Sequence, residues 1–245
     1  MNRIGFVGHA TVLLEIAGVR LLTDPLLRAR VAHLRRIVGF PVEGGLTDPH
    51  VVLISHAHLD HLDLPSLRRL APSARVILPR GWARLARRAG LRDVIEVEVG
   101  DRISLGDVDV VATAARHDGH RLPLLPAHRA LGYVVEGPRR VYFAGDTDLF
   151  EEMDDIAGEL DVALLPVAGW GRRLPPGHLD PERAARAVAI LGPRYAVPIH
   201  WGTYAAPGAH LEDTERPARE FARLAETYAP EVEVRVLHPG EHVEV

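Results

Sequence analysis

The sequence predicts an α/β protein in which strands and helices alternate along the chain. Its 245 residues are 47% hydrophobic and 25% charged, a composition typical of a globular protein with a sizeable core. Strand-like and helix-like stretches follow one another without a low-complexity segment or a linker. Continuous apolar runs at residues 51–55 and 162–167 are typical of strands buried on both faces. We therefore expect a single domain over residues 1–245.

The first half of the chain begins with strands. A strand-like pattern follows directly after Met1, and residues 11–16 and 19–23 flank an Ala17-Gly18 turn. Residues 26–45 mix arginines with apolar side chains; the pattern fits either a helix or a flap, and the role of this loop stays open. The elements expected next are strands at 51–55, 75–78 and 94–97 and helices at 63–70 and 82–89, the second ending at Gly90.

The second half continues the alternation. Asp180 can cap a helix over residues 181–191, Pro181 suits its first position and Gly192 ends it. The other expected elements are strands at 108–114, 131–136, 141–144, 162–167, 195–200 and 232–237 and helices at 150–157 and 214–228.

Charge and composition narrow the classes of function. A net charge of -4 argues against a protein that mainly binds nucleic acid. The chain has no cysteine, so any metal must be bound by His, Asp, Glu or backbone oxygen. We find neither a signal-peptide pattern nor an apolar run long enough to span a bilayer. We expect a cytoplasmic protein without stable membrane insertion that acts on a small molecule; the sequence leaves the oligomeric state open.

Three histidines and an aspartate fall within six residues, in the run His56-Ala57-His58-Leu59-Asp60-His61. The run follows the apolar stretch 51–55 directly, and ligands of α/β proteins bind at the carboxyl ends of such strands. Two histidines two residues apart can point to one side and bind one ion, and Asp60 and His61 can bind a second. A solvated histidine-rich loop is the alternative, but this density of ligands favours a site for a divalent metal such as zinc.

Three further candidates follow other predicted strands. His117 comes after residues 108–114, Asp146 after residues 141–144, and His200 ends the strand that begins at residue 195. Each could be an ordinary loop, turn or packed residue. Their common position after strands predicts that they converge on one rim together with the histidine run.

The complete series of motifs resembles the metallo-β-lactamase-fold hydrolases. The series is His-x-His-x-Asp-His, then a lone His, then Gly-Asp-Thr, then a late His, and it spans most of the chain. The resemblance implies a four-layer αββα sandwich and two divalent ions, with zinc as first choice and manganese or iron as alternatives. It implies one ion on His56, His58 and His117 and a second on Asp60, His61 and His200, with Asp146 bridging both.

Four shorter motifs resemble one branch of this superfamily, which contains N-acyl-phosphatidylethanolamine phospholipase D and the ascorbate-6-phosphate lactonase. They are Gly8-His9-Ala10-Thr11, Leu22-Thr23-Asp24-Pro25, the stretch 178–182, and the stretch 199–203. The resemblance implies that Asp24 is a buried group orienting the ligand histidines, although an Asp-Pro turn is the plain alternative. It also implies that His178 lies near the substrate. The alternative is that His178 has no role of its own and is only adjacent to Asp180, which caps the following helix.

These residues predict a hydrolase that uses a hydroxide bridging two metal ions. Asp60 would hold a metal and orient the hydroxide, and His178 would stabilise the developing oxyanion. A phosphodiester is the expected substrate, and a lactone or another ester of a small molecule, with or without a phosphate group, is the alternative. A non-catalytic metal-binding module is a further alternative, and β-lactams and nucleic acids fit the motifs and charge less well.

Overall fold

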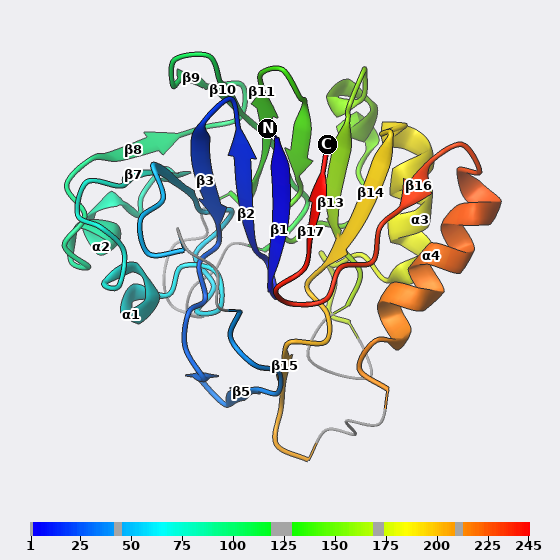
Figure 1. The fold of residues 1–245 in the computed structure, drawn as a ribbon, viewed down its shortest axis with the longest axis horizontal. Coiled ribbons are helices and arrows are strands. Elements are labelled where there is room, and N and C mark those ends of the chain that lie inside the picture. Colours follow the sequence, from blue (N-terminus) through cyan, green and yellow to red (C-terminus); the bar gives the residue numbers. More distant parts are fainter. Residues whose placement is uncertain (1, 42–45, 119–128, 169–173, 209–212) are drawn as a thin grey trace.

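The computed structural model describes residues 2–41, 46–118, 129–168, 174–208 and 213–245. Two seven-stranded sheets face each other, and helices cover their outer faces (Figure 1). This is the four-layer αββα arrangement of the metallo-β-lactamase fold. No helix among the described residues is both long and apolar enough to cross a membrane.

The first sheet is formed mainly by the N-terminal half of the chain, and the last strand closes its edge. Strands β1 to β3 are antiparallel, whereas β3, β6, β7 and β8 run parallel. Its order is β17 (His242–Glu244), β1 (Arg3–Gly8), β2 (Thr11–Ile16), β3 (Val19–Thr23), β6 (Val51–Leu53), β7 (Arg75–Pro79) and β8 (Val94–Val97).

Alternate residues of this sheet pack into two different cores. On β2, Val12 and Leu14 face the second sheet, while Leu13 between them faces the helices. Likewise Leu53 faces the second sheet and Val52 faces the helices. This is the two-residue period of a strand, and burial on both faces explains the continuous apolar run at residues 51–55.

The second sheet is built from the C-terminal half. Strands β9 to β12 are antiparallel, and β12, β13, β14 and β16 run parallel. Its order is β16 (Glu233–Val234), β14 (Tyr195–Ile199), β13 (Val162–Pro166), β12 (Val141–Phe143), β11 (Leu131–Glu136), β10 (Asp109–Ala114) and β9 (Arg102–Ser104).

The helices form the two outer layers, α1 and α2 on the first sheet and α3 and α4 on the second (Figure 1). Asp180 caps α3 by accepting a hydrogen bond from the backbone N–H of Arg183, and Gly192 ends that helix in a left-handed conformation, as expected. The bounds are α1 (Leu64–Leu67), α2 (Ala83–Arg87), the 3₁₀ helix η1 (Glu151–Ile156), α3 (Pro181–Leu191) and α4 (Arg216–Tyr228).

Several sequence expectations differ from the structure in detail. The described part of residues 26–45 forms no helix: β4 (Arg30–Val31) and β5 (Leu34–Arg36) form a small third sheet with β15 (Tyr204–Ala205). The helix expected at 150–157 is a 3₁₀ helix, and the strand expected at 232–237 shrinks to β16. Strands β9, β15 and β17 were not predicted because each is two or three residues long and shows too few residues for a period.

Candidate metal centre

The run from His56 to His61 begins three residues after the end of β6 and ends three residues before the start of α1. The backbone N–H groups of His61 and Leu62 both donate to the carbonyl of His58, at 3.1 and 2.9 Å, which folds the run into a tight turn. Asp63 then caps α1 by accepting from the backbone N–H of Ser66 at 3.0 Å. A strand end and a helix cap therefore fix both ends of the run.

Three histidines form the first group of metal-binding side chains, His56, His58 and His117. The Nδ1 atom of His58 lies 2.9 Å from Nε2 of His56 and 3.2 Å from Nε2 of His117. Ligand nitrogens of a tetrahedral zinc ion, at about 2.0–2.1 Å from the metal, lie about 3.4 Å from one another. The group therefore has close to the spacing of a preformed three-histidine site.

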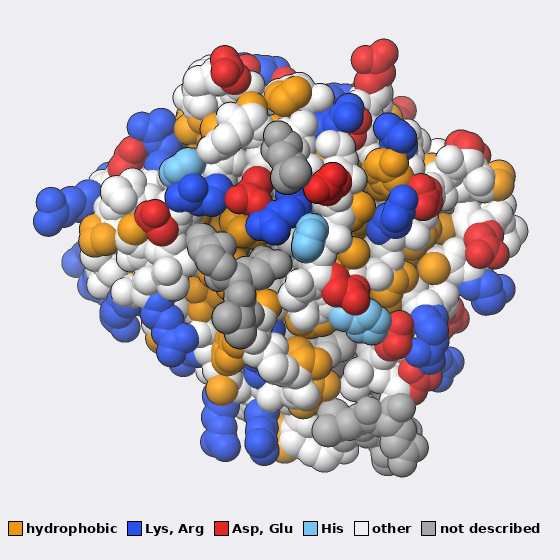
Figure 2. Space-filling view, in the orientation of Figure 1, with side chains coloured by type: hydrophobic (Ala, Val, Ile, Leu, Met, Phe, Trp, Pro, Cys, Tyr) orange, Lys and Arg blue, Asp and Glu red, His pale blue; other side chains and the backbone are white. Residues whose placement is uncertain are grey.

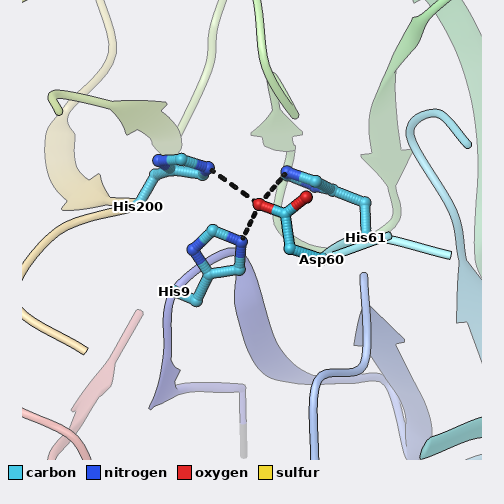
Figure 3. Close-up of side chains that lie close together, drawn as sticks. All are labelled: His9, Asp60, His61 and His200. Carbon is cyan, nitrogen blue, oxygen red and sulfur yellow. Dashed lines mark hydrogen bonds and ion pairs between the residues drawn. The ribbon is translucent and has the colours of Figure 1, made fainter. Parts of the chain in front are cut away.

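A second group consists of His9, Asp60, His61 and His200, whose rings and carboxylate converge in Figure 3. The Oδ2 atom of Asp60 lies 3.1 Å from Nε2 of His9, 3.7 Å from that of His61 and 4.0 Å from that of His200. His9 follows β1 and His200 follows β14, and the backbone N–H of His200 donates to the carbonyl of His9 at 2.8 Å. The two sheets are thus joined at the centre itself.

Asp146 lies between the two groups. Its carboxylate is 3.2 Å from Nε2 of His61, 3.4 Å from that of His200 and 3.9 Å from that of His56. Gly145 before it has φ +60°, and a Cβ atom there would lie 2.4 Å from Cβ of Ser55. Only glycine permits this close approach, which explains the Gly-Asp-Thr motif physically.

Asp24 lies at the end of β3, fully buried behind the histidine run. Its carboxylate accepts from the backbone N–H of Ser55 at 2.7 Å, from the Ser55 hydroxyl at 2.5 Å and from Nδ1 of His61 at 2.6 Å. The Ser55 oxygen in turn lies 2.9 Å from Nδ1 of His56 and accepts a hydrogen bond from that ring N–H, because its own hydrogen is donated to Asp24. One carboxylate therefore orients two histidines of the run and leaves their Nε2 atoms facing the centre.

Backbone carbonyls orient the histidines of the second sheet. Nδ1 of His117 donates to the carbonyl of Gly177 at 2.8 Å, and Nδ1 of His200 donates to that of Ala168 at 2.9 Å. A carbonyl can only accept, so the proton of each ring is on Nδ1 and the Nε2 lone pair is available to a metal ion. Burial lowers the pKa of His117 to about 4, which keeps this ring neutral.

The centre has a concentration of negative charge. Burial opposes ionisation of Asp60 and Asp146, but the charges of nearby histidines, His61 and His200 among them, hold the pKa of both carboxyls well below the usual value. Burial also opposes protonation of His61, yet the carboxylates of Asp146, Asp60 and Asp24 raise its pKa well above the usual value. The same carboxylates would attract a metal cation.

Two buried polar atoms at the centre lack a hydrogen-bond partner among the described residues, Nε2 of His61 and Oδ1 of Asp146. Leaving such atoms unsatisfied is costly, and both face the space where the ligand sets converge. Nitrogen and carboxylate donors with oriented lone pairs, unsatisfied buried atoms and excess negative charge all fit bound divalent metal ions.

His178 also faces the centre. It lies two residues before the Asp180 cap of α3; its Nδ1 is 3.1 Å from the carbonyl of Pro175 and its Nε2 is 3.5 Å from Asp146. Burial lowers its pKa, but the hydrogen bond and charge of Asp146 outweigh that effect and raise it.

The structure brings together all nine residues singled out from the sequence, which are Asp24, His56, His58, Asp60, His61, His117, Asp146, His178 and His200. Sequence reasoning did not assign His9 to the site, although its motif was noted. The available signal was a histidine directly after a strand end, following a glycine. In the structure Gly8 has φ +122°, and a Cβ atom there would lie 2.7 Å from Thr203.

Fold and site together define a metal-dependent hydrolase of the metallo-β-lactamase fold. The Beta-lactamase superfamily domain matches residues 19–201, and the chain belongs to this family. A UPF0173 metal-dependent hydrolase of Methanopyrus kandleri is 33% identical, with 99% of each chain covered. A UPF0173 metal-dependent hydrolase of Caldivirga maquilingensis is 30% identical over 98% of this chain and 97% of that protein.

A solved structure supports the same assignment. The novel metallo hydrolase Igni18 from Ignicoccus hospitalis superposes with a TM-score of 0.74 at 25% identity, covering 99% of this chain and 97% of that one. The short motifs predicted a narrower branch, that of N-acyl-phosphatidylethanolamine phospholipase D and the ascorbate-6-phosphate lactonase, and these relatives do not confirm it. They support only the assignment to metal-dependent hydrolases of the UPF0173 kind.

Proposed function

We propose that the centre binds two divalent metal ions, zinc in the first instance, and hydrolyses a phosphodiester. The observation that carries this proposal is the position of Asp146, whose carboxylate contacts histidines of both ligand groups. A carboxylate between two sets of imidazole ligands is the arrangement that a pair of cations requires. His56, His58 and His117 would hold one ion, and Asp60, His61 and His200 the other, with Asp146 bridging.

His9 belongs to the second set in one of two ways. Its Nε2 atom is 3.1 Å from Oδ2 of Asp60, so it can hold that carboxylate in place or join the ligands itself. Burial lowers the pKa of His9 to about 3, so the ring is neutral at physiological pH and adds no positive charge near a cation. We favour the positioning role, because the carboxylate it contacts is the group assigned to orient the attacking water.

Divalent ions bound here would lower the pKa of a coordinated water and polarise the scissile group. The side chains of the chain itself supply the remaining steps. Asp60, whose side chain is 15% exposed, accepts a hydrogen bond from the attacking water and orients it. His178, whose pKa is raised by Asp146, donates a proton or a hydrogen bond to the oxygen that gains charge.

Two features of the surroundings favour a phosphodiester over a neutral ester. Asp146, 3.5 Å away, raises the pKa of His178 and so favours the cationic form of its ring. All 29 lysine and arginine positions of the chain are arginines, and four of them lie in the segment 28–36. One of the four, Arg36, is 5.7 Å from the ring of Tyr204, which is in turn 5.9 Å from the ring of His9. Guanidinium groups match the geometry of phosphate oxygens.

The test compares hydrolysis of bis(p-nitrophenyl) phosphate with that of a simple lactone, each with and without chelator. We expect chelator-sensitive turnover of the phosphodiester; faster turnover of the lactone would replace the proposed substrate class, and no turnover of either would favour a binding module. Asp146→Ala should lose metal and activity together, and full metal content with full activity in this variant would exclude the two-ion centre.

A variant pair separates the role of His178 from general effects of removing a histidine. His178→Ala should retain both ions, as measured by elemental analysis, but lower kcat about 10²-fold or more if it stabilises charge. The matched control is His242→Ala, because His242 is exposed on the edge strand β17 and should leave kcat unchanged. Equal kcat in the two variants would remove His178 from the reaction.

A further inference from the structure

One ion pair of α3 joins this helix to the loop that carries Asp146. It is formed by Arg183 and Asp148, whose side chains are 35% and 17% exposed. Acidic and basic side chains are interspersed over the side of the molecule that α3 and α4 form, on the right of Figure 2, and most ion pairs on such a surface contribute little to stability. The Arg183 pair differs from these because it connects two separate elements beside the centre. Neither side chain has a role in the hydrolysis proposed above.

The guanidinium of Arg183 bridges two carboxylates. Its Nη1 donates to Oδ1 and Oδ2 of Asp148, at 2.8 and 2.7 Å, and its Nε donates to Oδ2 of Asp180 at 3.2 Å. The other carboxylate oxygen of Asp180 accepts from the backbone N–H of Arg183 at 2.8 Å, which is the cap of the helix. One arginine therefore holds the first turn of α3 against the loop that follows β12.

Asp148 is itself fixed to the segment that carries His117. Its backbone N–H donates to the carbonyl of Arg116 at 3.0 Å, and the N–H of Arg116 donates to the hydroxyl of Thr147 at 2.9 Å. The two segments pair here as a short antiparallel bridge. Asp148 is thus held on the metal-binding side, two residues after Asp146, and its carboxylate is the point to which α3 is attached.

His178 lies between this helix and the centre, in the stretch 174–180, which is neither helix nor strand. Immediately before it, the carbonyl of Gly177 accepts from Nδ1 of His117 at 2.8 Å. Two residues after it, Asp180 caps α3. The position of the His178 ring therefore depends on the contact with His117 and on the end of α3 that the arginine holds.

We propose that Arg183 is a positioning residue: by joining Asp148 to the first turn of α3, it holds the ring of His178 at the metal centre. This inference rests on the proposed function, in which His178 stabilises charge on the reacting oxygen. Misplacing such a group by about 1 Å can lower a rate about 10²-fold, whereas a partly exposed ion pair contributes little to stability. The pair should therefore matter far more for kcat than for folding.

The test is the effect of Arg183→Gln on hydrolysis of bis(p-nitrophenyl) phosphate, measured in the wild-type chain and again in the His178→Ala variant. A residue that acts through His178 has nothing left to position once that ring is gone. We expect Arg183→Gln to lower kcat at least about tenfold in the wild-type chain and less than about twofold in His178→Ala. The metal content should stay the same, and the midpoint of thermal unfolding should fall by no more than about 4 °C.

The matched control is Arg186→Gln. Arg186 also forms a 2.7 Å ion pair on α3, but its partner Glu182 belongs to the same helix, so the pair ties α3 to no other segment. The control should keep the kcat of the wild type. The proposal would be overturned by an unchanged kcat in Arg183→Gln, by an equal loss in the control, or by the same fold-loss with and without His178.

Hydrogen exchange measures the attachment without turnover. In chelated protein the backbone amides of residues 177–180 should exchange at least about tenfold faster in Arg183→Gln than in Arg186→Gln. This faster exchange in a protein whose wild type hydrolyses no phosphodiester would refute the hydrolytic proposal and leave the attachment of the segment standing. Equal exchange in the two variants would refute the positioning role, whatever the activity of the wild type.

Discussion

Replacing Asp24 by asparagine should convert His61 from the metal ligand proposed above into a blocked one. The new side chain has the same shape, but it can accept at one oxygen and must donate through its amide nitrogen. If the oxygen keeps the N–H of Ser55, the amide faces the Ser55 hydroxyl and Nδ1 of His61. Nδ1 of His61 must then accept, which places the ring proton on Nε2, the atom that faces the centre.

The expected magnitude follows from these contacts. Loss of a partner that orients a ligand histidine lowers metal affinity by about 10–100-fold, or about 1.4–2.7 kcal/mol. Three hydrogen bonds to the charged, buried carboxylate of Asp24 are either lost or replaced by weaker ones to a neutral amide, at about 1 kcal/mol each. The free energy of unfolding should therefore fall by about 3 kcal/mol. For a protein of this size the midpoint of thermal unfolding would fall by about 6–12 °C.

The assay is metal affinity by competition with a chromophoric chelator, together with thermal unfolding of the chelated protein. The control is Asp161→Asn. Asp161 also accepts a hydrogen bond from a backbone N–H, that of Arg140, but it lies before the first residue of β13, at the end of that strand away from the metal centre. The control should lower stability without changing metal affinity. If Asp24→Asn does the same, the carboxylate is a structural support and does not set the His61 tautomer.

Three other perturbations test the frame around the centre. Gly145→Ala should destabilise the protein by about 2 kcal/mol or more in chemical denaturation, because the new Cβ would lie 2.4 Å from Ser55. The control is Gly18→Ala, which has a positive φ and open space around it and should cost only about 1 kcal/mol. Equal losses in the two variants would refute the packing argument. In chelated protein the pKa is lowered to about 3 for His9 and about 4 for His117, so between pH 6.5 and 5 only the unfolded state takes up a proton on these rings. The free energy of unfolding should therefore fall on acidification by about 2 kcal/mol per ring. A calorimetric stability profile that is flat over this pH window would contradict the prediction. Adding chelator at pH 7 should lower the midpoint of thermal unfolding and excess zinc should restore it, whereas an unchanged midpoint would mean that the folded state holds no metal more tightly than the unfolded chain does.

The sequence predicted best those features that depend on local pattern. The run from His56 to His61 and the residues after β10, β12 and β14 could be located because each follows an apolar stretch of clear strand character. Strands β10, β12 and β14 run in the same direction and end at a common edge of the second sheet, so position along the chain was enough to predict that the residues after them converge.

The features that were missed depend on contacts between distant segments. His9 joins the site because its backbone bonds to that of His200, almost the whole chain away, and no local period reports such a contact. The β4–β5 hairpin pairs with β15, and its short strands alternate too briefly to be recognised. Arg36 looks like one arginine among many until the fold shows that it is buried.

The position of the centre between the two sheets has a consequence for biosynthesis. Asp24 and the run 56–61 belong to the half that is made first, whereas Asp146 and His200 come from the half that is made last. With the proposed ligands, a growing chain presents its histidine run long before the rest of the coordination sphere exists. If the centre binds the two ions proposed above, tight capture of the pair has to wait until residue 200 has been synthesised and the second sheet has docked, so metal loading would mark the completion of the fold.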